Sequence, residues 1–105
     1  MTLLPIRTWL PFPIRRVKIS GRSMLPTFQD GTVLYFRGGA TLRRVGQIVL
    51  IERESYPGIF YIKRITSITS EGIWVEGDNL EESTDSRKWG YLSPEEIIAV
   101  AFRHH

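Results

Sequence analysis

The 105-residue sequence contains no cysteine and only two histidines, His104 and His105, which are its last two residues. The lack of cysteine excludes disulfide bonds, thiolate catalysis and zinc or iron–sulfur sites with cysteine ligands. Chain ends usually fray, so both histidines are poorly placed for catalysis or for a metal site. We therefore expect no metal and no cofactor, and a serine hydrolase built from this chain would need lysine as its base.

Long hydrophobic runs are also missing, and none approaches the roughly 18 apolar residues of a membrane span. The most apolar terminal stretch, residues 3–14, is interrupted by Arg7 and three prolines, so it predicts neither a spanning helix nor a signal peptide. We assign residues 1–16 to an N-terminal arm that packs on the domain. Weak contact of this arm with a membrane surface is the alternative.

The charge is mildly basic, with a formal net charge of +3 and a pI near 9.6. Lysine and arginine are scattered along the chain, so no nucleic acid partner is expected from the charge. With 42% hydrophobic residues the chain is long enough for one core and too short for two ordinary domains. We assign residues 17–105 to a single domain.

Short runs rich in valine, isoleucine, tyrosine and phenylalanine alternate with turn signals, which is typical of all-β proteins. The sequence Ser-Pro-Glu-Glu of residues 93–96 predicts one helical turn before the last strand. We expect a mainly β, single-domain barrel with at most this one short helical turn. The expected strands are residues 17–20, 32–36, 47–52, 59–68, 72–76 and 97–102.

Ser23 is a candidate nucleophile in the segment GRSMLPT of residues 21–27. Gly21 allows a sharp bend and Pro26 restrains the exit, so the segment could present the hydroxyl at the rim of a barrel. It is not a nucleophile elbow, because Leu25 takes the place of the second glycine. Taken alone, such a serine is usually a turn residue.

Lys63 is the candidate base. Strand alternation places it on one face with Ile59, Tyr61 and Ile65, and apart from Lys63 this face is apolar. Burial on this face would lower the lysine pKa from about 10.4 toward the value of about 7 to 8 that suits a general base. Arg64 cannot serve, because a guanidinium does not deprotonate in proteins. The alternative for Lys63 is a solvated lysine on a half-exposed strand.

A polar segment of residues 77–90 follows. Locally it reads as a long loop with an ion pair between Asp85 and Arg87 or between a glutamate and an arginine, which would stabilise the fold little if exposed. Its functional interpretation is a set of supporting residues. Ser83 would hydrogen-bond the lysine amine, while Asp85 and Arg87 would hold the loop against it.

Three ordered blocks now stand out: SMLPT at residues 23–27, YIKR at residues 61–64, and GDN with SxDSRxxG within residues 77–90. Together they resemble the boxes of the S26 serine peptidases, the type I signal peptidase family, and more distantly the self-cleaving LexA-like repressors. The resemblance spans roughly residues 17–102. It implies a LexA-like or signal-peptidase-like β-barrel core.

The resemblance also implies roles for the residues in these boxes. Ser23 would attack a peptide carbonyl and neutral Lys63 would take its proton, giving an acyl-enzyme that water then hydrolyses. The backbone N–H of Ser23 would contribute to an oxyanion hole. Ser83 would orient the lysine, and Asp85 and Arg87 would form the structural pair of the family.

Substrates of the resembling family lie extended beside the two catalytic strands, with small residues at the first and third positions before the cut. By position, Ile19, Met24 and Ile62 would line the pocket that selects these residues, although each could equally belong to the core. Gly21 stands where some signal peptidases carry a serine that assists the oxyanion hole. A second donor to that hole is therefore open.

The chain shows neither a membrane anchor nor room for an inserted second domain. Within the family it is most similar to the small maturation proteases of nickel-containing superoxide dismutase, which trim a leader from a cytoplasmic precursor. We therefore expect a cytoplasmic serine endopeptidase that binds a leader-bearing precursor as an extended strand. A repressor is disfavoured, because the segment before Ser23 is too short for a DNA-binding domain.

Three alternatives remain open. One is general signal peptidase activity at the periphery of a membrane. Another is an inactive relative that only binds peptides. The third, of a different class, is a small β-barrel that binds single-stranded nucleic acid on its aromatic side chains.

Overall fold

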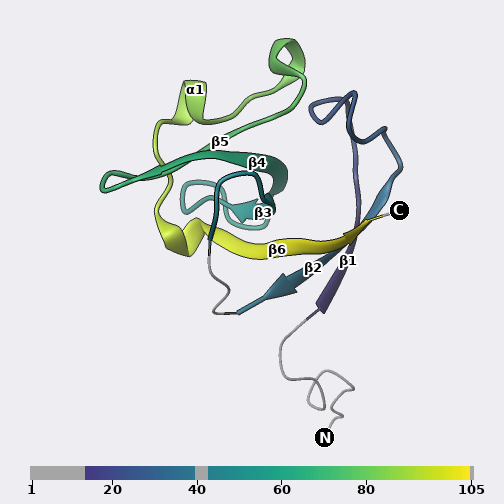
Figure 1. Cartoon of the computed structure of the whole chain (residues 1–105), viewed down its shortest axis with the longest axis horizontal. Helices are drawn as coiled ribbons and strands as arrows, with labels where there is room; N and C mark the ends of the chain where they lie inside the picture. The colour runs from purple at the N-terminus through teal and green to yellow at the C-terminus, as the bar shows by residue number, and fades with distance from the viewer. Residues whose placement is uncertain (1–13, 40–42, 105) are drawn as a thin grey trace, which may run out of the picture.

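The computed structural model describes residues 14–39 and 43–104, which form one antiparallel sheet of six strands in the order β1-β2-β6-β3-β4-β5 (Figure 1). Short helical segments separate the last two strands. The strands are β1 (Ile14–Lys18), β2 (Val33–Gly38), β3 (Ile48–Glu52), β4 (Phe60–Thr69), β5 (Gly72–Glu76) and β6 (Ile97–His104). The helical segments are η2 (Leu80–Glu82), α1 (Ser86–Trp89) and η3 (Pro94–Glu96).

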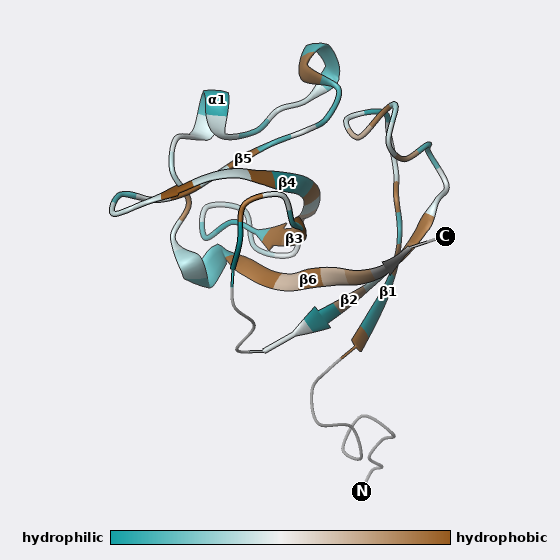
Figure 2. Cartoon of the chain, viewed as in Figure 1, coloured by the Kyte–Doolittle hydropathy of each residue, from teal (hydrophilic) through white to brown (hydrophobic). Residues whose placement is uncertain are grey.

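The strand β3 lies between two hydrophobic clusters, which explains its unbroken apolar run. Ile48 and Leu50 face the first cluster, together with Leu34 and other side chains of β2. Val49 and Ile51 face the second, with side chains of β5 and β6. Because side chains alternate along a strand, a strand buried on both faces must be apolar at every position. Figure 2 shows the hydrophobic colour of β3 and of much of β6.

The sheet bends at three irregularities in its register. They fall between Tyr35 and Phe36 in β2, between Leu50 and Ile51 in β3, and within β4 after Ile65. Such bulges increase the local twist and let one sheet curl around two clusters. The strands β1 and β5 remain the two edges of this curled sheet.

The predicted mainly β, single-domain fold is confirmed. The helical turn expected at residues 93–96 is η3, and its serine and glutamate form the predicted capping box. The structure adds η2 and α1 within residues 77–90, which were predicted to be a loop. The helix α1 forms there because Asp85 caps it by accepting the N–H of Arg87. The first strand also differs from the prediction, since it begins at Ile14, within the segment assigned to the arm, and ends at Lys18.

The rest of the arm, residues 1–13, lies outside the described residues, as do its predicted packing and membrane contact. In the part of the chain that is described, no helix has the length and hydropathy needed to cross a membrane. The loop between β1 and β2 lies at the same end of the molecule as η2 and α1, at the top of Figure 1. Ser23 belongs to this loop, Ser83 lies between η2 and α1, and Asp85 precedes α1.

Candidate active site

The loop after β1 holds Ser23 between two fixed points. At its start, Gly21 has a φ of +100°, a conformation that side-chain-bearing residues rarely adopt, and its N–H donates to Asp30 Oδ1 at 2.8 Å. After the serine, Met24 is 1% exposed and its carbonyl accepts the N–H of Phe28 at 2.9 Å. The loop therefore buries the residue that follows Ser23 while Ser23 itself stays partly accessible.

Lys63 is buried on β4, with only 4% of its surface exposed. It alternates with half-buried Tyr61 and fully buried Ile65, as the sequence predicted. Ile59 does not join them, because it precedes β4 and is exposed. The strand β5 ends where Glu76 pairs with Arg64, so Lys63 lies just beyond the end of its neighbouring strand. Its amine is free to reach the segment that follows β5.

Ser83 fixes the direction of the hydrogen bond that Lys63 makes. The hydroxyl of Ser83 donates to Asp85 Oδ2 at 2.6 Å and accepts from Lys63 Nζ at 3.0 Å and from the N–H of Gly77 at 3.1 Å. A hydroxyl has only one proton to donate, so Ser83 can only accept from the amine. A neutral Lys63 can donate one of its protons here and keep its lone pair for another group.

Asp85, which accepts the hydrogen bond of the Ser83 hydroxyl, has a fully buried side chain. It accepts hydrogen bonds from Ser83, from the backbone N–H groups of Gly77 and Arg87, and from the Arg87 guanidinium. Burial alone would raise the pKa of Asp85, but these hydrogen bonds together lower it from 3.8 to about 2. The predicted pair of Asp85 and Arg87 is therefore present, with its carboxylate ionised.

The pKa of Lys63 is lowered from its ordinary value, and burial is the main cause. Asp85 acts in the opposite direction and Arg87 adds to the lowering. Desolvation outweighs the attraction of the carboxylate, because Ser83 separates the amine from Asp85 and no salt bridge joins them within the described residues. The amine of Lys63 therefore loses its proton more easily than the amine of an exposed lysine.

Gly77 lies where the three parts of the site meet. A Cβ atom at this position would contact Ser83 Oγ and would stand 2.6 Å from the backbone carbonyl oxygen of Ser23. No real Cβ tolerates such contacts, so only glycine lets the serine loop and Ser83 approach each other this closely. Asn79 secures the approach by donating its N–H to the Ser23 carbonyl at 2.8 Å.

We expect Gly77→Ala to lower kcat/KM for peptide cleavage about 100-fold, because the methyl group forces Ser23 and Ser83 apart and small displacements are costly in catalysis. Steady-state kinetics on a cleaved peptide would measure this. Gly58→Ala is the matched control: its φ of +87° makes alanine strained, but nothing lies within 4 Å of the new atom. This control should lose stability and keep its activity, and an equally active Gly77→Ala would contradict the steric argument.

A second bridge joins the serine loop to the lysine strand, and the sequence analysis assigned it no role. Asp78 accepts a hydrogen bond from Thr27 Oγ1 at 2.6 Å and pairs in bidentate fashion with Arg64, which neighbours Lys63. These hydrogen bonds lower the pKa of Asp78 despite its partial burial. The only signal in the sequence was that all three residues fall inside the three blocks.

Ser23 and Lys63 line the same cleft, which has a volume of about 400 Å³. Among the described residues, Ser23 Oγ and Lys63 Nζ share no hydrogen bond, a common situation where the substrate that would draw such groups together is absent. Ser23 donates its backbone N–H to no acceptor in that part of the chain, so this N–H is available to an oxyanion. Gly21 cannot assist, because Asp30 takes its N–H.

The predicted pocket residues Ile19, Met24 and Ile62 all line this cleft and also pack in the first hydrophobic cluster. Both interpretations of them are therefore compatible with the structure. Further lining residues were not singled out from the sequence: Val17, Lys18, Ser20, Leu50, Phe60, Tyr61 and Thr84. In residues 14–39 and 43–104, no group of histidine, aspartate and glutamate side chains is arranged to hold a metal ion.

A loop serine and a buried lysine at one cleft of a β domain are the parts that a serine peptidase with a lysine base requires. A comparison of the sequence with models of known protein families agrees with a serine peptidase fold. The model of the Peptidase S24-like family matches residues 7–91, and the chain therefore belongs to this family. The family lies in the superfamily of LexA-like and signal-peptidase-like proteins. No curated protein matches the chain.

Proposed function

We propose that this protein is a serine endopeptidase in which Ser23 is the nucleophile and Lys63 the general base. The observation that carries the proposal is the buried amine of Lys63, whose acceptor Ser83 has its own proton committed to Asp85. This arrangement leaves a lone pair on a neutral lysine inside the cleft that Ser23 also lines. A structural lysine would gain more from a direct carboxylate partner than from a hydroxyl acceptor.

In the proposed reaction, Ser23 Oγ attacks the carbonyl carbon of the scissile bond while Lys63 Nζ takes the hydroxyl proton. The Ser23 N–H stabilises the oxyanion of the tetrahedral intermediate. The ammonium of Lys63 then gives the proton to the leaving amine as the carbon–nitrogen bond breaks, leaving an ester on Ser23. Water attacks this ester with Lys63 again accepting the proton, which releases the acid product and free Ser23.

We further propose that the substrate is a precursor protein with an N-terminal leader, bound as an extended strand. The three blocks that resemble those of the S26 peptidases support a substrate of the leader or signal type. Within that class we propose a role in maturing a nickel-containing superoxide dismutase. The shallow floor formed by Ile19 and Met24, both nearly fully buried, suits small side chains beside Ser23. General signal peptidase activity at a membrane is the second candidate within this class.

Mass spectrometry of a peptide library that contains leader and signal sequences would test the proposal. At about pH 8 we expect cuts after small residues, present with the native protein and absent with Ser23→Ala. Cuts that persist in Ser23→Ala would contradict the serine mechanism. If the native protein binds peptides of the library but cuts none of them, the result would instead favour an inactive relative of the peptidases that only binds peptides.

The rate should depend on pH through Lys63. The neutral amine is the reactive form, so kcat/KM should rise as the pH rises through the lysine pKa and then level off. Because burial lowers that pKa, the plateau should begin below the range of an ordinary lysine, which titrates near 10.5. A profile of kcat/KM from pH 5 to 10 would measure this, and a rate that does not change across this range would contradict a lysine base.

A further inference from the structure

The cleft continues beyond Ser23 and Lys63 into a second hollow of about 360 Å³. Val17, Leu50 and Phe60 line both spaces, so they form one groove. Its two walls are strand edges that no other described strand covers, because within residues 14–39 and 43–104 β1 pairs only with β2, and β5 pairs with β4 only from Arg64 onward. An extended peptide can therefore lie along β1 and hydrogen-bond to a free edge.

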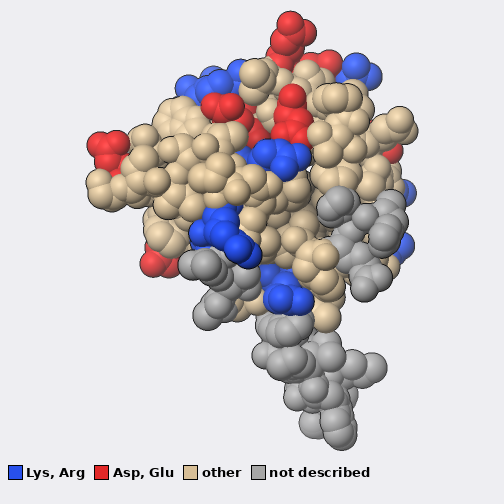
Figure 3. All heavy atoms as spheres, in the orientation of Figure 1, with Lys and Arg blue, Asp and Glu red and all other residues tan. Residues whose placement is uncertain are grey.

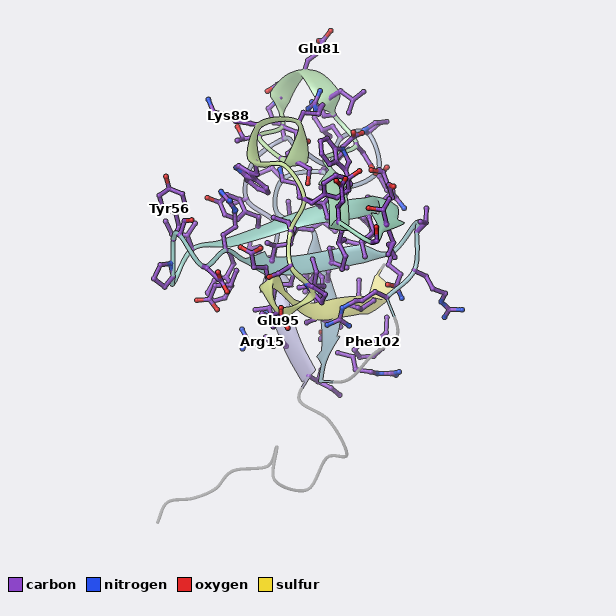
Figure 4. All side chains as sticks on the ribbon, turned by 90° about the vertical axis from the view of Figure 1, so that its left-hand side faces the viewer. Arg15, Tyr56, Glu81, Lys88, Glu95 and Phe102 are labelled. Atoms are coloured by element: carbon purple, nitrogen blue, oxygen red, sulfur yellow. The ribbon has the colours of Figure 1, made fainter. Side chains whose placement is uncertain are left out.

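Arg15 stands at the far end of this groove. Like Val17, it lies on the side of β1 that faces the core, since the partners of these two residues on β2 are the buried Phe36 and Leu34. Its guanidinium lies 5.8 Å from the ring centre of Phe60 on the opposite wall, within the range of a cation–π contact. Figure 4 shows Arg15 at the lower end of the sheet, on the side opposite Phe102.

The charged side chains along the groove are all basic. Arg15, Arg16, Lys18 and Lys63 line it, whereas no aspartate or glutamate does. Among the described residues, none of these four forms a salt bridge with a carboxylate. Glu52, which pairs with Phe60 across the strands, instead accepts the N–H of Gly58. The face drawn in Figure 3, by contrast, carries interspersed acidic and basic side chains.

We propose that Arg15 forms a specificity subsite for an acidic side chain at the fifth position before the cut. This inference rests on the proposed function, in which Ile19 and Met24 form the floor for small side chains beside Ser23, and it takes Ile19 as the residue opposite the first position before the cut. Side chains on one face of a strand recur every second residue, about 6.6 Å apart, so a peptide aligned with β1 keeps step with it. Its third residue then meets Val17 and its fifth meets Arg15, where an aspartate or glutamate finds a cation that forms no salt bridge within the described residues.

Peptides with alanine at the first and third positions before the cut, and aspartate, asparagine or lysine at the fifth, would test this subsite. At low salt we expect kcat/KM for the aspartate peptide to exceed that of asparagine about threefold and that of lysine about tenfold. The preference should shrink as salt is added. Arg15→Gln should remove it, and Arg15→Glu should reverse it.

Lys88→Glu is the control, because it makes the same change in net charge at an exposed position far from Arg15 in Figure 4. It should keep the preference for aspartate. Equal cleavage of the three peptides would overturn the subsite while leaving the peptidase intact.

Binding of the same labelled peptides to Ser23→Ala, followed by fluorescence anisotropy, separates the two proposals. If the native protein cuts no peptide but Ser23→Ala binds the aspartate peptide most tightly, the acidic-side-chain site at Arg15 stands and the proposed function fails. If the native protein cuts no peptide and Ser23→Ala binds all three equally, both proposals are contradicted.

Discussion

Replacing Lys63 by methionine should reduce kcat/KM for peptide cleavage by about 10⁴-fold or more, without unfolding the protein. Methionine has a similar length and fills the same buried space, but it can neither accept the proton of Ser23 nor return one to the leaving amine. The loss should appear in kcat rather than in KM, because the side chain acts on the transition state and not on substrate binding. Single-turnover kinetics on a cleaved peptide would measure it.

The stability of the same variant distinguishes a base from a structural lysine. A buried amine loses hydration, and within the described residues Lys63 recovers only one hydrogen bond, to a neutral hydroxyl. We expect Lys63→Met to unfold in urea with a free energy within about 1 kcal/mol of the native protein, or higher. A large loss of stability would mean that the amine is needed for folding, and the loss of activity would then say little about catalysis.

The variant Lys63→Arg sharpens the test, since arginine keeps the charge but cannot deprotonate. It should be as inactive as Lys63→Met. The double variant with Ser23→Ala should lose no more activity than either single variant, because two groups that act as one unit are not additive. Additive losses would mean that Ser23 and Lys63 act independently, contrary to the dyad.

Local patterns in the sequence predicted the surroundings of single residues of the candidate site. Alternation along one strand placed Lys63 beside Tyr61 and Ile65, and the polar segment of residues 77–90 suggested a hydrogen bond between Ser83 and the lysine amine. Such patterns reach only a few residues. They therefore indicated the candidate residues and some of their near contacts, but not the bridges between the serine loop and the rest of the site.

The bridges between distant segments could not be predicted in this way. Thr27 and Asp78 are 51 residues apart, and their hydrogen bond exists only because the sheet brings two loops to one end of the molecule. The need for glycine at Gly77 has the same origin, since the atoms that exclude a side chain belong to Ser23 and Ser83. The bulge in β4 after Ile65 was also missed, because alternation assumes a regular strand.

Replacing Asp85 by asparagine should lower the free energy of unfolding by about 3 kcal/mol at neutral pH. The two carboxylate oxygens face only donors among the described residues. Ser83, the Gly77 N–H and Arg87 Nη2 donate to Oδ2, and the backbone N–H and Nε of Arg87 donate to Oδ1. An asparagine NH₂ group in either orientation turns its own protons toward one of these sets. The variant therefore leaves buried donors unpaired and removes the counter-charge of Arg87, which urea unfolding would detect.

The pH dependence of stability gives an independent measurement of the same carboxylate. The folded-state pKa of Asp85, about 2, lies below its ordinary value of 3.8, so ionised Asp85 stabilises the fold. This contribution, on the order of 2 kcal/mol, is complete above about pH 5 and is lost as the pH falls toward 2. Asp85→Asn should lack that part of the acid loss, so the two stability curves should approach each other at low pH. Parallel curves would contradict the assignment.

Asp85→Asn should also move the pH profile of catalysis, which a purely structural role would not do. The carboxylate favours the charged form of Lys63, so its removal should lower the lysine pKa and shift the rise in kcat/KM to lower pH. Ser83→Ala is the matched comparison, because it removes the hydroxyl between Lys63 and Asp85 but keeps the negative charge. A shift of the profile in Asp85→Asn that Ser83→Ala does not reproduce would assign the effect to charge. Identical profiles in the native protein and Asp85→Asn would mean that Asp85 only holds the loop in place.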